Sequence, residues 1–281
     1  EALFEAARSE LREWIDRHRA NANTAAQARS KAKQLARLEE QELAAPEQLV
    51  HLRLPRPERR SGTALRCVNL GIGYPGATVA ERIGVEIEHG ARVAVVGDNG
   101  QGKTTFLRTI TGSLPPVAGD VKWSHGCSIG TYAQHVYSSL PGERAVSDYL
   151  HSCAAEDVSH QEVLDVAGGF LFSGDDLNKT VSVLSGGERA RLCLAGILLG
   201  KRSVLVMDEP VTHLDVETAD ALSDALSTFP GTVLFASHDR RFIERVATHV
   251  LEVRDGRVAN YPGEFELYLY RVEQEDREST E

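Results

Sequence analysis

The sequence lacks any apolar run long enough to cross a membrane. A spanning helix needs about 18 or more consecutive apolar residues, whereas the longest runs here are Leu192–Leu199 and Val204–Met207. A secretory leader is not expected either, because the chain opens at Glu1 with a charged stretch and no basic segment followed by an apolar one. Its 281 residues are 42% hydrophobic and 26% charged, which is the balance of a globular protein with enough chain for a substantial core.

Cysteine is scarce, and the few cysteines are scattered. The four positions, Cys67, Cys127, Cys153 and Cys193, form no Cys-x-x-Cys pair. This spacing argues against a disulfide framework and against a zinc site, and it favours a reducing compartment. Together with the missing membrane span, it predicts a cytoplasmic protein.

Acidic residues are absent from a stretch near the start of the chain. Residues 17–38 contain six basic residues and no Asp or Glu, and residues 1–60 hold 12 Lys or Arg against 10 Asp or Glu. The rest of the chain has 19 basic and 31 acidic residues, a net charge of −12. A basic patch on an acidic body is typical of a nucleic-acid contact. On charge alone, however, a solvated helix face is the more frequent explanation.

The first part of the chain is predicted to form an α-helical hairpin over residues 1–45. Apolar residues recur at spacings of three and four from Phe4 to His18, and the pattern repeats after a turn at Asn21–Thr24. Residues 46–62 contain three prolines and are expected to form an extended linker.

From residue 63 the pattern changes to short apolar strands that alternate with helices. Strands are predicted at Ala91–Val96, Ser203–Met207 and Thr232–Ala236, and helices at Lys103–Thr111, Gly187–Leu199, Glu217–Thr228 and Asp239–Val246. Residues 63–272 are therefore predicted to form an α/β domain around a buried, mainly parallel sheet. Residues 273–281 are expected to be a polar, frayed tail.

Residues Gly97–Thr104 fit the phosphate-binding pattern Gly-x-x-x-x-Gly-Lys-Ser/Thr. The loop follows a predicted strand and opens a predicted helix, where backbone N–H groups surround phosphate oxygens. Lys103 is predicted to contact the β- and γ-phosphates of a nucleotide, and the Thr104 hydroxyl to bind Mg²⁺. The predicted nucleotide contacts of this segment are Gly97, Asn99, Gly100, Gly102, Lys103, Thr104 and Thr105.

A second candidate feature is the apolar strand that ends in Asp208 and Glu209. The carboxyl ends of strands are where α/β folds bind their ligands. Asp208 is predicted to join Thr104 as a ligand of Mg²⁺, and Glu209 to act as the base that positions an attacking water. Such a pair alone is more often the start of a helix, so this interpretation depends on the phosphate loop.

The segment Leu184–Glu188, Leu-Ser-Gly-Gly-Glu, is by itself only a capping turn before a helix. Together with the two motifs above it resembles the signature of ATP-binding cassette (ABC) ATPases. The resemblance implies an ABC-type P-loop nucleotide-binding domain behind an N-terminal α-helical hairpin, with ATP and Mg²⁺ as its ligands. It also implies roles for residues that alone would more often be structural: Tyr74 stacks on adenine, Gln134 meets Mg²⁺ and the attacking water, Asp215 lies between two cassettes, and His238 contacts the γ-phosphate.

Further motifs, at Ser185–Leu192, Asp208–Asp215, Ser237–Phe242 and Tyr261–Phe265, are similar to those of the ABC-F branch, and residues 17–33 resemble the linker between its two cassettes. This implies that the chain, which does not begin with Met, is the C-terminal cassette of a longer ATPase. Its partners would be a second cassette, the ribosome and the P-site tRNA, and no membrane. The signature residues Ser185, Gly186, Gly187 and Glu188 would complete the partner cassette's site, and the RNA-facing residues would be Arg17, Arg19, Arg29, Lys31 and Lys33.

The chain departs from the ABC-F motif at Val211 and Thr212, where the branch has Thr-Asn. Hydrolysis is expected to survive, because the carboxylates and His213 are retained. Two alternatives stay open. The ATPase subunit of a membrane transporter explains the cassette but not the basic hairpin, and a non-hydrolytic, ATP-gated scaffold is suggested by the two departures.

Overall fold

The computed structural model describes residues 52–133, 137 and 140–278. The chain divides into two units, residues 1–49 and 50–281, and the described residues all belong to the second. The predicted hairpin over residues 1–45, with the five basic residues expected to face RNA, therefore lies outside the described residues, and so does Gln134.

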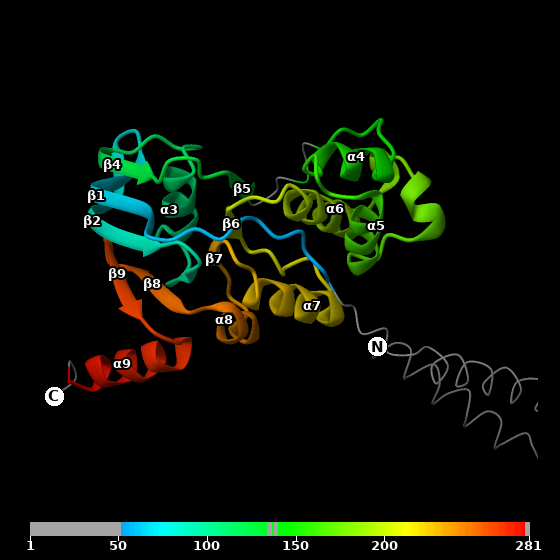
Figure 1. Cartoon of the computed structure of the whole chain (residues 1–281). Helices are drawn as coiled ribbons and strands as arrows, with labels where there is room; N and C mark the ends of the chain where they lie inside the picture. Colours follow the sequence, from blue (N-terminus) through cyan, green and yellow to red (C-terminus); the bar gives the residue numbers. More distant parts are fainter. Residues whose placement is uncertain (1–51, 134–136, 138–139, 279–281) are drawn as a thin grey trace, which may run out of the picture. The chain divides into compact units, whose positions relative to one another are not determined.

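A six-stranded sheet forms the centre of the described part (Figure 1). In spatial order its strands are β5 (Ile129–Tyr132), β6 (Val204–Asp208), β7 (Thr232–Ala236), β3 (Arg92–Val96), β8 (His249–Arg254) and β9 (Arg257–Pro262). The first five are parallel, and β9 pairs with β8 antiparallel. Every residue of β6 and β7 is buried, which is why these strands are continuous apolar runs without alternation. The predicted parallel sheet is confirmed.

A second, antiparallel sheet of three strands was not predicted from the sequence. Its spatial order is β2 (Ala77–Glu88), β1 (Thr63–Tyr74) and β4 (Ala118–Trp123). Helix α3 (Lys103–Ile110) packs between the two sheets, because Phe106 shares one buried cluster with Leu70 of β1 and Val206 of β6. Strand β4 has no buried residue, so its sequence lacks the periodic apolar residues from which a strand is predicted.

Three helices form a lobe beside the central sheet, and three more follow later in the chain (Figure 1). The lobe contains α4 (Val146–Cys153), α5 (His160–Gly169) and α6 (Gly186–Leu199), with short 3₁₀ turns η2 (Gly174–Asn178) and η3 (Val181–Val183); α7 (Val216–Ser227), α8 (Arg240–Val246) and α9 (Phe265–Glu278) complete the domain. The four predicted helices and three predicted strands are confirmed, each end within one residue.

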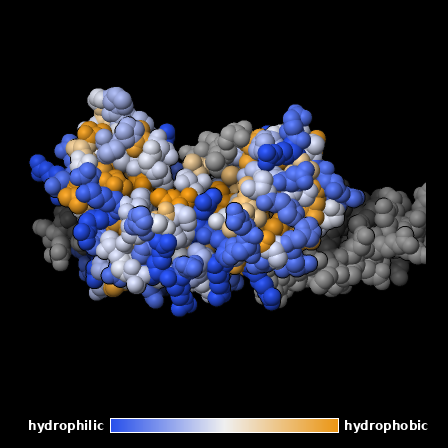
Figure 2. All heavy atoms as spheres, turned by 45° about the horizontal axis from the view of Figure 1, so that its top comes forward, coloured by the Kyte–Doolittle hydropathy of each residue, from blue (hydrophilic) through white to orange (hydrophobic). Residues whose placement is uncertain are grey.

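The expectation of a frayed tail over residues 273–281 was wrong for most of that segment, because α9 continues to Glu278. The segment is polar, but Glu, Gln and Arg are good helix formers, and polarity alone does not end a helix. None of the helices in the described part of the chain has the length and apolar character that a bilayer crossing requires. On the face drawn in Figure 2, hydrophobic residues gather in small groups among hydrophilic ones.

The described part of the expected linker, residues 52–62, has no helix or strand but is packed on the domain. Leu52 is 8% exposed and belongs to the same buried cluster as Val166 and Phe170. A Cβ atom at Gly169 would lie 2.6 Å from Leu52 Cδ1, so the glycine makes room for this contact. Arg60 Nη1 adds a hydrogen bond of 2.9 Å to the carbonyl oxygen of His125.

Candidate nucleotide-binding site

The loop between β3 and α3 depends on glycine for its shape. Gly97, Gly100 and Gly102 have φ values of 141°, 84° and 110°, which favour glycine. A Cβ atom would lie 2.2 Å from the carbonyl oxygen of Val253 at position 97, and 2.4 Å from Val79 Cγ1 at position 102. Helix α3 begins directly after this loop with no side-chain cap. Its first N–H groups therefore have no side-chain acceptor, which is the arrangement that binds anions.

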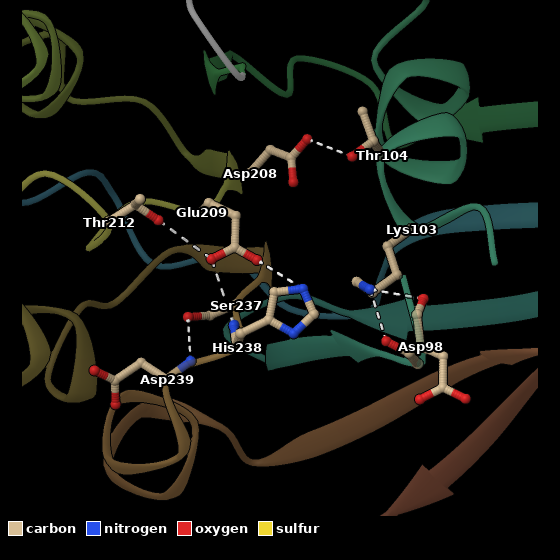
Figure 3. A network of polar contacts seen from close by, with 10 residues as sticks. Asp98, Lys103, Thr104, Asp208, Glu209, Thr212, Ser237, His238 and Asp239 are labelled. Carbon is tan, nitrogen blue, oxygen red and sulfur yellow. Dashed lines mark hydrogen bonds and ion pairs between the residues drawn. The ribbon is translucent and has the colours of Figure 1, made fainter. Parts of the chain in front are cut away.

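Lys103 is folded back into the loop. Its Nζ atom donates hydrogen bonds of 2.6 Å to the carbonyl oxygen of Gly97 and 3.0 Å to that of Asp98 (Figure 3). Burial lowers the pKa of Lys103, while the carboxylates of Glu209 and Asp208 act in the opposite direction. The Lys103 ammonium group therefore has loop carbonyl oxygens as its acceptors. Phosphate oxygens are acceptors of the same kind and could take their place.

Thr104 and Asp208 meet although they lie 104 residues apart in the chain. Thr104 Oγ1, in the first turn of α3, donates a hydrogen bond of 2.7 Å to Asp208 Oδ2 at the end of β6 (Figure 3). Two hard oxygen ligands side by side suit Mg²⁺, which proteins bind with one or two carboxylates and with phosphate or water oxygens. Within the described residues, no group of three or more His, Cys, Asp or Glu side chains has an arrangement that could hold a metal ion by itself. A cation held here would therefore complete its shell with phosphate and water.

Glu209 has a strained backbone and a carboxylate in contact with His238. Its φ is 53°, which is uncommon for a residue other than glycine, and its N–H donates to the carbonyl oxygen of Ala236 at 2.9 Å. Its Oε1 lies 3.5 Å from His238 Nε2, and its Oε2 accepts the His238 backbone N–H at 3.4 Å (Figure 3). Burial raises the pKa of Glu209, and the neighbouring Asp208 adds to this, against the influence of His238 and Lys103.

These side chains come together because three parallel strands end at the same edge of the sheet. Strands β6, β7 and β3 are neighbours, and they are followed by Glu209, His238 and the phosphate loop respectively. The result is an open pocket of about 590 Å³. It is lined by Asn99, Gly100, Gly102, Lys103, Thr104, Thr105, Asp208, Glu209, Thr212 and His238.

Two of the predicted site features lie apart from this pocket. Tyr74 ends β1, is 43% exposed and is not a lining residue. On the paired strand β2, Val79 lies against Gly102 of the phosphate loop. Asp215 caps α7 and accepts hydrogen bonds of 2.9 and 3.0 Å from the backbone N–H and the hydroxyl of Thr218.

The signature segment also lies outside the pocket lining, at the start of α6. Ser185 and Glu188 form a capping box, in which Glu188 Oε2 accepts the backbone N–H and the hydroxyl of Ser185, each at 2.7 Å. These two hydrogen bonds lower the pKa of Glu188. Ser185 and Gly186 are exposed, so this helix start is open to a partner.

Two contacts involve residues that were not predicted to belong to the site, one in the pocket and one outside its lining. Thr212, noted only as a departure from a motif, donates its hydroxyl to Glu209 Oε2 at 3.4 Å. Tyr137 lies beyond β5, and its hydroxyl is 3.3 Å from His213 Nε2 with the two rings edge to face. The Tyr137 contact has no signal in the sequence, because it joins segments that are 76 residues apart. The Thr212 contact is local, because it spans the three residues of one short turn.

Comparisons with known proteins define the class of protein to which this fold belongs. Residues 80–212 match the family described as "ABC transporter", and residues 4–52 match a second family with the same description. The structure of an ATP-binding subunit of an ABC transporter aligns with a TM-score of 0.64 at 21% identity, over 71% of this chain and 90% of that one. A dimeric ATP-binding cassette in a post-hydrolysis state, bound to ADP and phosphate, aligns with a TM-score of 0.60 at 19% identity. The fold is that of an ABC ATPase cassette.

Several curated relatives narrow this assignment. The probable ATP-binding protein YbiT of Escherichia coli O157:H7 is 36% identical over 93% of this chain and 49% of its own length. The putative ATP-binding protein YdiF of Bacillus subtilis is 36% identical over 92% of the chain and 40% of its own length. The ABC transporter F family member 5 of Arabidopsis thaliana is 34% identical over 92% of the chain and 38% of its own length. The chain belongs to the ABC-F family of ABC ATPases, and it spans half or less of these relatives.

Proposed function

We propose that this chain binds MgATP in the pocket between β3, β6 and β7, and hydrolyses it as one cassette of a two-cassette ABC-F protein. The observation that carries the proposal is the convergence of Lys103, Thr104, Asp208, Glu209 and His238 on one pocket from separate segments. Each residue type matches a task that phosphoryl transfer requires, namely phosphate binding, metal binding and activation of water.

Phosphate oxygens would replace the loop's own carbonyl oxygens as hydrogen-bond acceptors. Lys103 exchanges the carbonyl oxygens of Gly97 and Asp98 for phosphate oxygens, and the first N–H groups of α3 bind the same anion. Thr104 and Asp208 would hold Mg²⁺, which when bound neutralises charge on the phosphates. Glu209 takes a proton from the attacking water, while His238 lies beside it and donates toward the γ-phosphate.

The signature would act on the partner cassette. Ser185 and the start of α6 are exposed and do not line this chain's pocket, so a complete site needs the signature of a second cassette. The dimeric state of the cassette aligned above supports this arrangement. Each composite site then combines one chain's phosphate loop with the other's signature.

A dilute solution of this chain is expected to hydrolyse ATP slowly, with a rate per chain that rises with concentration. Half of each composite site is missing from a monomer, and homodimerisation would supply it. The measurement is phosphate release over a range of chain concentrations, with sedimentation to report the oligomeric state. Concentration-independent turnover by a monomer would contradict the composite site.

Complementation between two inactive variants sharpens this test. Lys103→Ala removes the predicted phosphate contact and leaves the signature segment intact. Gly187→Asp disrupts the signature segment and leaves the phosphate loop intact. An aspartate is tolerated in the first turn of a helix, yet its charge repels a triphosphate. Mixing the two variants is expected to restore part of the rate, because one intact composite site forms. A mixture as inactive as its components would argue against action in trans.

A role on the ribosome, in the cytoplasm, forms the second part of the proposal. It is supported by the ABC-F family membership and by the basic residues of the segment 17–38, which carries no acid. We expect this segment to contact ribosomal RNA or the P-site tRNA, since the acidic remainder of the chain repels RNA. Bound ATP would hold two cassettes together, and hydrolysis would release the ribosome.

Replacing the five basic residues by glutamine is expected to weaken ribosome binding by orders of magnitude at moderate salt and to flatten its salt dependence. Each lost phosphate contact lowers the slope of log affinity against log salt by about 0.7 to 0.9. Binding is measured by co-sedimentation in the Glu209→Gln background. The changed residues are Arg17, Arg19, Arg29, Lys31 and Lys33.

The matched control replaces five exposed basic residues of the described domain by glutamine. It is expected to weaken ribosome binding much less. The control positions are Arg82, Arg108, Lys122, Arg241 and Arg257. If the five-residue variant of the first segment keeps its affinity and its slope, the basic segment is a solvated surface. Co-purification with membranes in place of ribosomes would then favour the ATPase subunit of a transporter.

A further inference from the structure

Thr212 closes a short turn onto Glu209. Its backbone N–H donates to the carbonyl oxygen of Glu209 at 3.4 Å, and its hydroxyl donates to Glu209 Oε2 at the same distance. The preceding residue, Val211, is 8% exposed and belongs to the main buried cluster. The turn is therefore anchored in the core on one side while Thr212 lines the pocket on the other.

The two oxygens of the Glu209 carboxylate have different surroundings. Oε2 accepts from two donors, the Thr212 hydroxyl and the His238 backbone N–H, both at 3.4 Å. Oε1 faces the ring of His238, with Nε2 at 3.5 Å (Figure 3). The backbone of Glu209 is fixed as well, by its hydrogen bond to Ala236. The remaining freedom is rotation of the side chain, and the two donors on Oε2 oppose it.

We infer that Thr212 is a positioning residue for Glu209: its hydroxyl, together with the His238 N–H, holds Oε2 and leaves Oε1 to accept the proton of the attacking water. This inference rests on the proposed function. A base that is already oriented needs no reorganisation when the water attacks, and small displacements of a catalytic group cost much of the rate. Threonine suits the task because its branched side chain has restricted χ1 freedom.

The test replaces Thr212 by residues that keep or remove the donor. Thr212→Val preserves the shape and removes the hydroxyl, and kcat is expected to fall about tenfold, as for the loss of one hydrogen bond to a charged group. KM for ATP is expected to stay within about twofold of the parent, since the hydroxyl contacts no described phosphate-binding group. Thr212→Ala should show the same loss, whereas Thr212→Ser and Thr212→Asn keep a donor and should recover most of kcat.

Turnover is measured at the concentration where the rate per chain no longer rises. The matched control is Thr228→Val, an exposed threonine at the end of α7 whose hydroxyl bonds only to backbone carbonyls. Its kcat is expected to equal that of the parent. Because Thr212 acts through Glu209, Thr212→Val should cause no further loss in a Glu209→Gln background.

Different outcomes separate this inference from the proposed function. If Glu209→Gln keeps the parent rate, Glu209 is not the base, and the proposed function fails. If Glu209→Gln is inactive but both Thr212→Val and Thr212→Ala turn over like the parent, only the positioning role is overturned. The role is also overturned if Thr212→Ser fails to recover the rate, or if the losses are additive in the double variant, because the effect would then be structural.

Discussion

Replacing Glu209 by glutamine is expected to lower ATP turnover by at least about two orders of magnitude while ATP stays bound. A positioned general base contributes roughly 10²- to 10⁴-fold to the rate of such a reaction. The change removes the negative charge at nearly constant volume. The amide oxygen still accepts from the Thr212 hydroxyl and the His238 N–H, so the local fold is expected to persist.

The measurement pairs steady-state phosphate release with retention of radiolabelled ATP after gel filtration. Glu88→Gln is the matched control, since Glu88 is exposed at the end of β2 and lies outside the pocket lining. The control is expected to turn over at the parent rate. A Glu209→Gln chain that hydrolyses ATP as fast as the parent would show that another group activates the water.

Alanine at Gly97 is expected to lower the free energy of unfolding by more than about 3 kcal/mol and to abolish ATP binding. Its φ of 141° is strained for any residue with a side chain, and the new Cβ would lie 2.2 Å from the carbonyl oxygen of Val253. That oxygen belongs to strand β8, which pairs with β3, so neither strand moves without breaking its pairing. The strain would therefore be relieved in the loop that surrounds the phosphates.

Gly100→Ala serves as the comparison in the same loop. Its φ of 84° also favours glycine, but a Cβ atom there meets nothing within 4 Å. The expected loss is only the backbone penalty, about 1 to 2 kcal/mol. Urea unfolding of both variants gives the two free energies. Equal, small losses in the free energy of unfolding at the two positions would mean that β8 shifts to accommodate the new Cβ atom. The close approach of Gly97 to Val253 would then contribute little to stability.

The two departures from the ABC-F motif have different surroundings in the structure. Val211 is buried in the core, where a methyl group in place of a hydroxyl leaves no polar atom without a partner. Thr212 still offers a donor to the Glu209 carboxylate. These surroundings favour hydrolysis over the non-hydrolytic scaffold, and the Glu209→Gln comparison decides between the two.

Local pattern was sufficient to predict much of the central domain. Strands β6 and β7 are buried on both faces, so their residues are apolar without interruption and stand out in the sequence. The phosphate loop is equally local, because its glycines, lysine and threonine are consecutive and must follow a strand and precede a helix. The capping box that opens α5 is local as well, because Ser159 and Glu162 form the pattern Ser-x-x-Glu.

The antiparallel sheet had a weaker signal in the sequence than the central sheet. Strand β4 is exposed or half-buried along its whole length, and the pairing of β1 with β2 contains register shifts. Only the second half of β2, Ile83 to Glu88, has the regular alternation of buried and exposed residues that identifies a half-buried strand. The polar composition of residues 273–281 predicts a frayed tail, but polar residues with high helix propensity continue α9 to Glu278.

The sequence by itself determined which residue types are present for nucleotide chemistry and the strand or turn on which each lies. Only the tertiary structure decided which of them meet. Thr104 reaches Asp208 because α3 packs between the sheets, and Glu209 reaches His238 because β6 and β7 are parallel neighbours that end at one edge. The same packing leaves Ser185 outside the pocket lining, whereas the contact of Thr212 with Glu209 lies within one short turn. Distances between remote segments depend on strand order and helix packing, which no local spacing encodes.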